Sequence, residues 1–140
     1  MEMSTFYHVI TKPDSNYSVV VEDDGKVAYA YLLHDGIIVG DVWLYNQHEA
    51  PEQPEWNDES RMPFLNPKSY VKPISLAPLT DIKDVQVVWR KKATNEIEAV
   101  ELHLRGQRFA AMSPGSKPGF SLLALKDGPL AKVLATGGNQ

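Results

Sequence analysis

The sequence contains no cysteine, which excludes disulfides, thiolate metal sites and cysteine nucleophiles. Long hydrophobic runs are missing too, since no stretch approaches the roughly 18 apolar residues that a membrane span requires. The first residues, Met1 to Ser4, carry neither the basic region nor the apolar core of a signal peptide. From these absences we expect a cytoplasmic protein that does not bind membranes.

Residue patterns that identify a reaction are also missing. No two of the four histidines have the spacing that places two imidazoles on one face of a strand or helix, so no metal site is predicted. Segment 113–119 is rich in Ser, Gly and Pro but lacks the spacing of a phosphate-binding loop. Because the pI is near 5.5 and the basic residues form no continuous stripe, nucleic-acid binding is not expected.

The chain has 140 residues, of which 43% are hydrophobic and 23% charged. Domains hold roughly 100–200 residues, and a chain of this length buries about two-thirds of the surface that its unfolded form exposes. It therefore needs no metal or disulfide to fold. We expect a single all-β domain over residues 1–140, with a long irregular loop at 46–78 and a frayed tail at 137–140.

Positive charge is scarce in the first part of the chain. Residues 1–60 hold twelve acidic side chains and only two basic ones, Lys12 and Lys26, whereas residues 61–140 hold six acidic and twelve basic side chains. This asymmetry predicts one acidic and one basic face or layer. Either the two parts attract each other within one fold, or an acidic surface steers a basic partner toward the protein.

Four β-strands are predicted in the first third of the chain, because short segments rich in β-branched and aromatic residues alternate with turn-forming clusters. The predicted strands cover residues 6–10, 17–21, 26–34 and 37–45. Both faces of the last two strands are largely apolar. This is typical of central strands covered on two sides, or of strands with one face reserved for a partner.

Asp35-Gly36 lies between the last two of these strands and predicts a hairpin with a two-residue turn, because such a turn needs positive φ at both central positions. Continued without interruption, the register of this hairpin pairs Ala30 with Asp41. Asp41 would then lie on the face opposite Tyr29 and Tyr31.

Asp41 is the only aspartate embedded in an apolar strand pattern. In this register it shares a face with His34, but about 13 Å separates the two positions at roughly 3.3 Å per residue, which is too far for a catalytic pair. We therefore expect no catalytic residue and no cofactor. An enzyme that uses Asp41 remains an alternative.

Six of the ten prolines lie between Asn46 and Pro78, where they prevent regular structure because proline lacks a backbone donor and restricts the residue before it. Loops beyond about 12–15 residues are uncommon in compact domains and are usually functional or disordered. This stretch also contains aromatic and aliphatic anchors. We expect residues 47–60 to be mobile and residues 62–79 to lie against the body of the fold.

Strand patterns return near residue 84. Alternation from Val85 to Arg90, followed by a four-residue loop at 92–95, predicts a hairpin that pairs Val87 with Val100. A helix over 95–105 is the alternative, but its apolar positions fit one helical face poorly. Further strands are predicted at 107–112 and 120–125.

The last segment, Asp127-Gly128-Pro129, predicts the start of a short C-terminal helix that ends at Gly137. The whole pattern predicts a mainly β fold. It is an antiparallel β-sandwich, or a small barrel, of two four-stranded meanders joined by a long Pro-rich crossover.

Aromatic and acidic side chains occur together, since eight of the thirteen aromatic residues precede residue 60. Aromatic residues fill β cores, but tryptophan and tyrosine beside carboxylates also anchor protein interfaces. We therefore predict a non-enzymatic interaction module that binds a protein partner, either as a homodimer or other homo-oligomer, or as an acidic binder of a basic protein. The candidate contact residues are Asp41, Trp43, Tyr45, Glu49, Glu55 and Trp56. The alternative is a β-sandwich or barrel that holds a small apolar ligand, with loop 51–78 as a lid.

Overall fold

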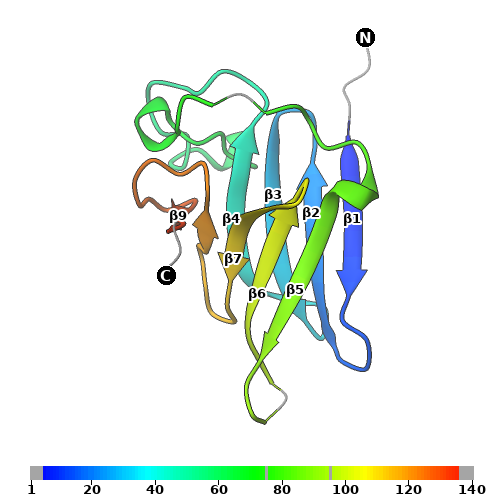
Figure 1. The fold of residues 1–140 in the computed structure, drawn as a ribbon. Coiled ribbons are helices and arrows are strands. Elements are labelled where there is room, and N and C mark those ends of the chain that lie inside the picture. The colour runs from blue at the N-terminus through cyan, green and yellow to red at the C-terminus, as the bar shows by residue number, and fades with distance from the viewer. Residues whose placement is uncertain (1–4, 75, 95, 136–140) are drawn as a thin grey trace.

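Two β-sheets form the fold, and each is built from one continuous part of the chain (Figure 1). In the computed structural model, which describes residues 5–74, 76–94 and 96–135, the first sheet has the strand order β1-β2-β3-β4 and the second β5-β6-β7-β8-β9. Neighbouring strands are antiparallel except β8 and β9, which are parallel. The predicted mainly β architecture is therefore confirmed.

The four strands predicted between residues 6 and 45 all form. They are β1 (Phe6–Thr11), β2 (Tyr17–Asp23), β3 (Val27–His34) and β4 (Ile37–Asn46). The second sheet consists of β5 (Val85–Lys91), β6 (Ile97–Leu104), β7 (Gln107–Met112), β8 (Phe120–Ser121) and β9 (Lys132–Val133). The connection between the sheets contains three short 3-10 turns, η1 (Glu59–Arg61), η2 (Lys68–Tyr70) and η3 (Ile82–Asp84).

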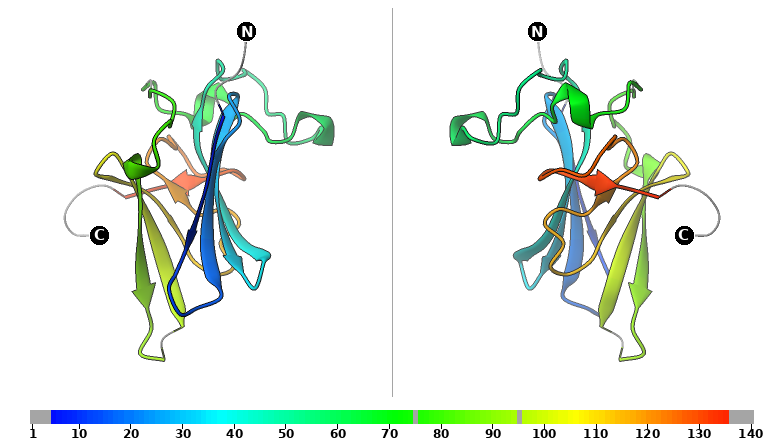
Figure 2. Two further views of the ribbon diagram at one scale, coloured as in Figure 1. Left: turned by 90° about the vertical axis from the view of Figure 1, so that its right-hand side faces the viewer. Right: turned by 90° about the vertical axis from the view of Figure 1, so that its left-hand side faces the viewer.

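Side chains from both sheets fill the space between them. Val21, Leu32 and Val42 of the first sheet and Leu102 and Met112 of the second belong to one buried cluster. Each such side chain stabilises the fold by about 1.5–3 kcal/mol relative to an exposed position. Figure 2 shows the two sheets edge-on as separate layers, so the arrangement is sandwich-like.

The second part of the chain covers the outer edge of β4. The Trp43 N–H donates a hydrogen bond to the Leu130 carbonyl oxygen at 2.9 Å. Segment 113–119, between β7 and β8, also runs along this edge and approaches Gly40 closely. A Cβ at Gly40 would lie only 3.2 Å from the Ser113 carbonyl oxygen. This contact joins the two sheets along one side of the molecule.

The hairpin register predicted from the turn at residues 35–36 is correct beside the turn and wrong beyond it. The first two pairs form as predicted, but after Val39 the register shifts, so that Asp41 pairs with Tyr31 instead of Ala30. A β-bulge of this kind inserts one extra residue and turns the side chains that follow to the other face of the sheet.

The C-terminal helix predicted from Asp127-Gly128-Pro129 is wrong for the described residues. Residues 132 and 133 instead form β9, which adds a fifth strand to the second sheet, and the Lys132 N–H donates to the Gly119 carbonyl oxygen at 2.8 Å. A helix would use these backbone groups internally, so it would break the bonds to the neighbouring strand. The predicted helix end at Gly137 and the frayed tail 137–140 lie outside the described residues.

The proline-rich connection is irregular where the structure describes it. From residue 47 to residue 78 it contains two 3-10 turns and one isolated bridge, between Val71 and Ala124. Leu65 and Leu79 are buried, in line with the expectation that 62–79 lies against the body of the fold. The predicted mobility of 47–60 stays a prediction.

Candidate functional site: the tyrosine pocket

The outer face of the first sheet, which points away from the second sheet, combines aromatic, aliphatic and acidic side chains. Residues that pair across antiparallel strands share a face, and the four strands contain no lysine or arginine. Two neighbouring rows of paired residues supply the aromatic, aliphatic and acidic side chains of this surface. We call it the acidic sheet face, formed by Tyr7, Val9, Val20, Glu22, Tyr31 and Asp41.

Asp41 reaches the acidic sheet face because of the bulge at Val39. In an uninterrupted register it would pair with Ala30 and point between the sheets. Two hydrogen bonds fix its backbone: the Asp41 N–H donates to the Ser116 carbonyl oxygen at 3.0 Å, and the Gly119 N–H donates to the Asp41 carbonyl oxygen at 2.7 Å. The position of Asp41 therefore depends on a loop more than 70 residues further along the chain.

Asp41 lines a small pocket of about 210 Å³, which we call the tyrosine pocket. The sheet contributes Tyr29, Tyr31 and Asp41, and two loops contribute residues 62–64 and 129–130. Figure 2 shows that the segment around η1 extends beyond the first sheet on the side away from the second sheet. The pocket is thus assembled from β3, β4 and two distant loops.

The two tyrosines lie two residues apart on β3, so both point to the same side of the sheet. Their ring centroids are 6.2 Å apart and their planes differ by 12°. The Tyr29 hydroxyl donates to the Phe64 carbonyl oxygen at 2.7 Å, which ties one wall of the pocket to the sheet. The pocket therefore presents aligned aromatic rings beside a carboxylate.

Burial raises the pKa of Asp41 above its ordinary value, and the positive charge of Lys117 partly offsets this effect. Within the described residues, the Asp41 carboxylate forms no hydrogen bond or ion pair. Burial, followed by the negative charges of Glu22, Asp41 and Asp24, raises the pKa of Tyr31 to about 12. The Tyr31 hydroxyl is consequently protonated at neutral pH and can donate a hydrogen bond.

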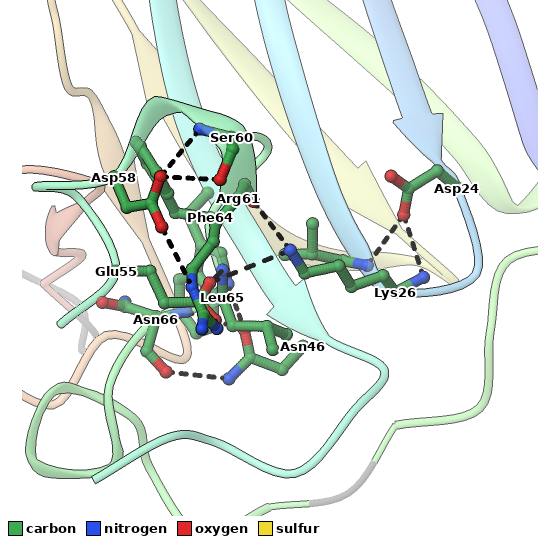
Figure 3. Close-up of polar contacts among 12 residues, drawn as sticks. Asp24, Lys26, Asn46, Glu55, Asp58, Ser60, Arg61, Phe64, Leu65 and Asn66 are labelled. Atoms are coloured by element: carbon green, nitrogen blue, oxygen red, sulfur yellow. Dashed lines mark hydrogen bonds and ion pairs between the residues drawn. The ribbon is translucent and has the colours of Figure 1, made fainter. Parts of the chain in front are cut away.

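A polar cluster holds the proline-rich segment in place beside the pocket, as Figure 3 shows. Glu55 lies 3.8 Å from the Lys26 ammonium and 3.5 Å from the Arg61 guanidinium, and its Oε1 accepts a hydrogen bond from the Leu65 N–H at 2.9 Å. The Lys26 ammonium also donates to the Arg61 carbonyl oxygen at 2.8 Å. Glu55, predicted as a contact residue, thus has its carboxylate engaged within the molecule.

The other predicted contact residues lie in different surroundings. Trp43 and Tyr45 are 0% and 1% exposed, so the expectation that their side chains lie on a surface is corrected. The Trp43 indole N–H donates to the Asn46 side-chain oxygen at 2.8 Å, and the Tyr45 hydroxyl accepts from the Leu79 N–H at 3.0 Å. Trp56 is partly buried, and Glu49 is exposed. Of the predicted residues, only Asp41 lines the tyrosine pocket.

Most of this pocket could not be predicted from the sequence. The uninterrupted hairpin register puts Tyr29 and Tyr31 on the face opposite Asp41, and no sequence pattern indicates a role for residues 62–64 or 129–130. The pocket depends on a bulge and on contacts between distant segments, which no local pattern encodes. The enrichment of aromatic and acidic residues before residue 60 was the one available indication.

A larger cleft of about 510 Å³ lies beside the end of β4. Residues 46–50 line one side, and Val71, Ile74 and Leu76 contribute apolar side chains from the proline-rich connection. Its volume falls in the range of roughly 300–1,000 Å³ that is typical of small-molecule sites. Glu49, one of the predicted contact residues, lines this cleft and not the tyrosine pocket.

No protein-family model matches the chain, and comparisons with curated proteins and with solved structures also find no match. In the part of the chain that the structure describes, no group of three or more His, Cys, Asp or Glu side chains is arranged to hold a metal ion. No helix within residues 5–74, 76–94 and 96–135 is long and apolar enough to cross a membrane. A function for this chain has to be argued from the geometry of its own sites.

Proposed function

We propose that the protein is a non-enzymatic interaction module that binds a basic segment of a partner protein on its acidic sheet face. A cationic side chain of that segment enters the tyrosine pocket beside Asp41. The observation that carries this proposal is the Asp41 carboxylate, which is partly buried in a pocket lined by aromatic and proline side chains. Among the described residues it forms no ion pair, and the nearby Lys117 only partly offsets the effect of burial on its pKa.

The environment of Asp41 favours a cation. Partial removal of water makes an unpaired carboxylate costly, and a bound cation offsets that cost. Aromatic rings beside the carboxylate add cation–π attraction of about 0.5–2 kcal/mol. A partner's lysine or arginine would therefore gain from both kinds of group in one pocket.

The charges around the pocket also support a basic partner. Of the bases near the pocket, Lys26 and Arg61 are both within 4 Å of Glu55, and Lys117 acts on Asp41 without forming an ion pair with it. Glu22 and Asp41 take part in no ion pair among the described residues. A surface whose acidic side chains form no ion pairs accelerates the approach of a basic partner, and this attraction weakens in high salt.

Calorimetric titration of the full chain with a flexible lysine-rich peptide of about 12 residues, and with a glutamate-rich peptide of equal length, tests the proposal. We expect only the lysine-rich peptide to bind. Asp41→Asn should bind it at least tenfold less tightly than the wild type does, which corresponds to about 1.4 kcal/mol. Glu98→Gln makes the same change of charge on an exposed position of the second sheet and should leave the affinity unchanged. Equal weakening by both variants, or no binding at all, would overturn the proposal.

A second copy of the chain is the competing occupant of the acidic sheet face. The second sheet carries Arg90, Arg108 and Lys132 on its strands, so a head-to-tail contact between copies would also pair opposite charges. Native mass spectrometry distinguishes the two cases. A monomer that binds the basic peptide supports the proposal, whereas an oligomer that Asp41→Asn dissociates would make the partner this chain itself.

Binding of a small apolar molecule is a second candidate function, favoured by the volume and apolar lining of the cleft beside β4. The core side chains fill the space between the sheets, so the ligand would lie under the proline-rich connection and not between the layers. An apolar fluorescent dye should then bind the wild-type chain and bind Ile74→Ser less tightly. Ile82→Ser, at an equally exposed position outside the cleft, is the control.

A further inference from the structure

The groups that line the tyrosine pocket favour one kind of cation over others. This inference rests on the proposed function. Two carbonyl oxygens beside the pocket already accept one hydrogen bond each, that of Phe64 from the Tyr29 hydroxyl and that of Leu130 from the Trp43 backbone N–H. The loop residues that line the pocket are Met62, Pro63, Phe64, Pro129 and Leu130, none of which has a polar side chain. The polar side-chain groups of the lining are the Asp41 carboxylate and the two tyrosine hydroxyls, of which that of Tyr29 is already bonded.

This lining suits a cation that brings few hydrogen-bond donors. An arginine guanidinium has five N–H donors and a lysine ammonium has three, and each buried donor without an acceptor is costly. A methylated ammonium carries its charge on C–H groups, which need no acceptor and favour aromatic faces. One carboxylate then suffices to balance the charge.

The size and rigidity of the pocket agree with this ligand. At about 210 Å³ it is smaller than the roughly 300 Å³ at which small-molecule clefts begin, so it fits the end of a side chain better than a whole metabolite. The bond from Tyr29 to Phe64 holds sheet and loop together, so the aromatic surface is formed before binding. We propose that the tyrosine pocket binds the methylated ammonium group of a modified lysine side chain in the basic partner segment.

Four peptides of equal length that differ only at one central position test this proposal by calorimetric titration of the full chain. The central residue is trimethyllysine, lysine, arginine or the uncharged analogue in which a carbon replaces the trimethylated nitrogen. We expect trimethyllysine to bind about tenfold more tightly than each of the others. A preference for arginine or lysine, or equal affinity for the trimethyllysine and carbon analogues, would overturn it.

Two variants identify the groups responsible. Tyr31→Phe keeps the aromatic ring and should retain the preference for trimethyllysine over lysine, whereas Tyr31→Leu should abolish it. Thermal unfolding of both variants checks that they fold, and if Tyr31→Leu does not, loss of the preference in Asp41→Asn serves in its place. If all four peptides bind equally and Asp41→Asn still weakens them, the methyl-specific inference fails and the proposed function stands. If no peptide binds, both fail.

Discussion

At the scale of single residues, aromatic side chains that the sequence predicts as contact residues are buried and stabilise the interior. Tyr45 is 1% exposed, and its hydroxyl donates to the Asp23 carboxylate at 2.7 Å and accepts from the Leu79 N–H at 3.0 Å. Gln47 and the Gly25 N–H also donate to Asp23, at 2.6 and 2.9 Å. These bonds satisfy a buried carboxylate and link β2, β4 and the connection between the sheets.

Removal of the Tyr45 hydroxyl by Tyr45→Phe should lower the free energy of unfolding by about 1–3 kcal/mol, because the Leu79 N–H loses its acceptor and Asp23 loses a donor. Denaturant unfolding measures the change. Tyr7→Phe is the matched control, since Tyr7 is 65% exposed, and it should change the free energy by less than about 0.5 kcal/mol. Equal effects of the two variants would contradict the structural role of Tyr45.

Unlike the Tyr45 hydroxyl, the ionised Asp41 carboxylate should lower the free energy of unfolding when no partner is bound. Because its pKa is raised in the folded state, the folded chain holds this proton more strongly than the unfolded chain, and stability falls as pH rises above 3.8, the ordinary value. Asp41→Asn removes this loss of stability. Denaturant unfolding at pH 7 should give the variant a free energy of unfolding at least as high as that of the wild type. The difference between the two should be smaller at pH 4. A variant less stable than the wild type at pH 7 would show that contacts within the chain stabilise the carboxylate.

At the scale of elements, the strands of the first sheet were predictable and their register was only partly so. Apolar alternation and turn residues locate β1 to β4, but the bulge at Val39 leaves no recognisable sequence pattern. Its shift of one residue moves Asp41 to the other face. In the second hairpin the predicted pairing of Val87 with Val100 is also wrong, since Val87 pairs with Leu102. That shift of two residues leaves each side chain on its predicted face, because strands have a period of two.

The C-terminal helix shows a different limit of prediction. Local spacing favoured a helix, but the Leu130 carbonyl oxygen bonds to Trp43 of β4 and the Lys132 N–H bonds to Gly119, just before β8. The tyrosine pocket has the same origin, because its walls at 62–64 and 129–130 are placed by contacts that no local pattern describes. The positions of β1 to β7 could therefore be predicted from the sequence, whereas β8 covers only the first two residues of the predicted strand 120–125 and β9 replaces the predicted helix. The site built on these strands could not be predicted.

The element that walls the pocket, the proline-rich segment, depends on Glu55. Glu55→Ala removes the acceptor of the Leu65 N–H and both ion pairs, so it should lower the free energy of unfolding by about 1–3 kcal/mol. It should also accelerate hydrogen exchange at Leu65. Glu52→Ala is the control, since Glu52 is 77% exposed and forms one ion pair, with Lys68. If hydrogen exchange at Leu65 is unchanged in Glu55→Ala, Glu55 does not hold this segment in place.

At the scale of the whole molecule, the charge asymmetry of the sequence becomes a difference between two sheets. The strands of the first sheet carry Glu22, Asp23 and Asp41 and neither Lys nor Arg, whereas the strands of the second sheet include Arg90, Lys91, Arg108 and Lys132. Among the described residues, no ion pair joins an acid of a first-sheet strand to a base of a second-sheet strand. The acidic side chains of the first sheet are therefore not neutralised by ion pairs with the strands of the second sheet.

The central claim is that a basic segment binds the acidic sheet face at the tyrosine pocket. The most direct test is a nuclear magnetic resonance titration of the isotope-labelled full chain with the lysine-rich peptide. We predict shift changes concentrated at Tyr31, Asp41 and Phe64, reduced at high salt and lost in Asp41→Asn. Shift changes confined to the second sheet, or to the cleft lined by Val71 and Ile74, would contradict the claim.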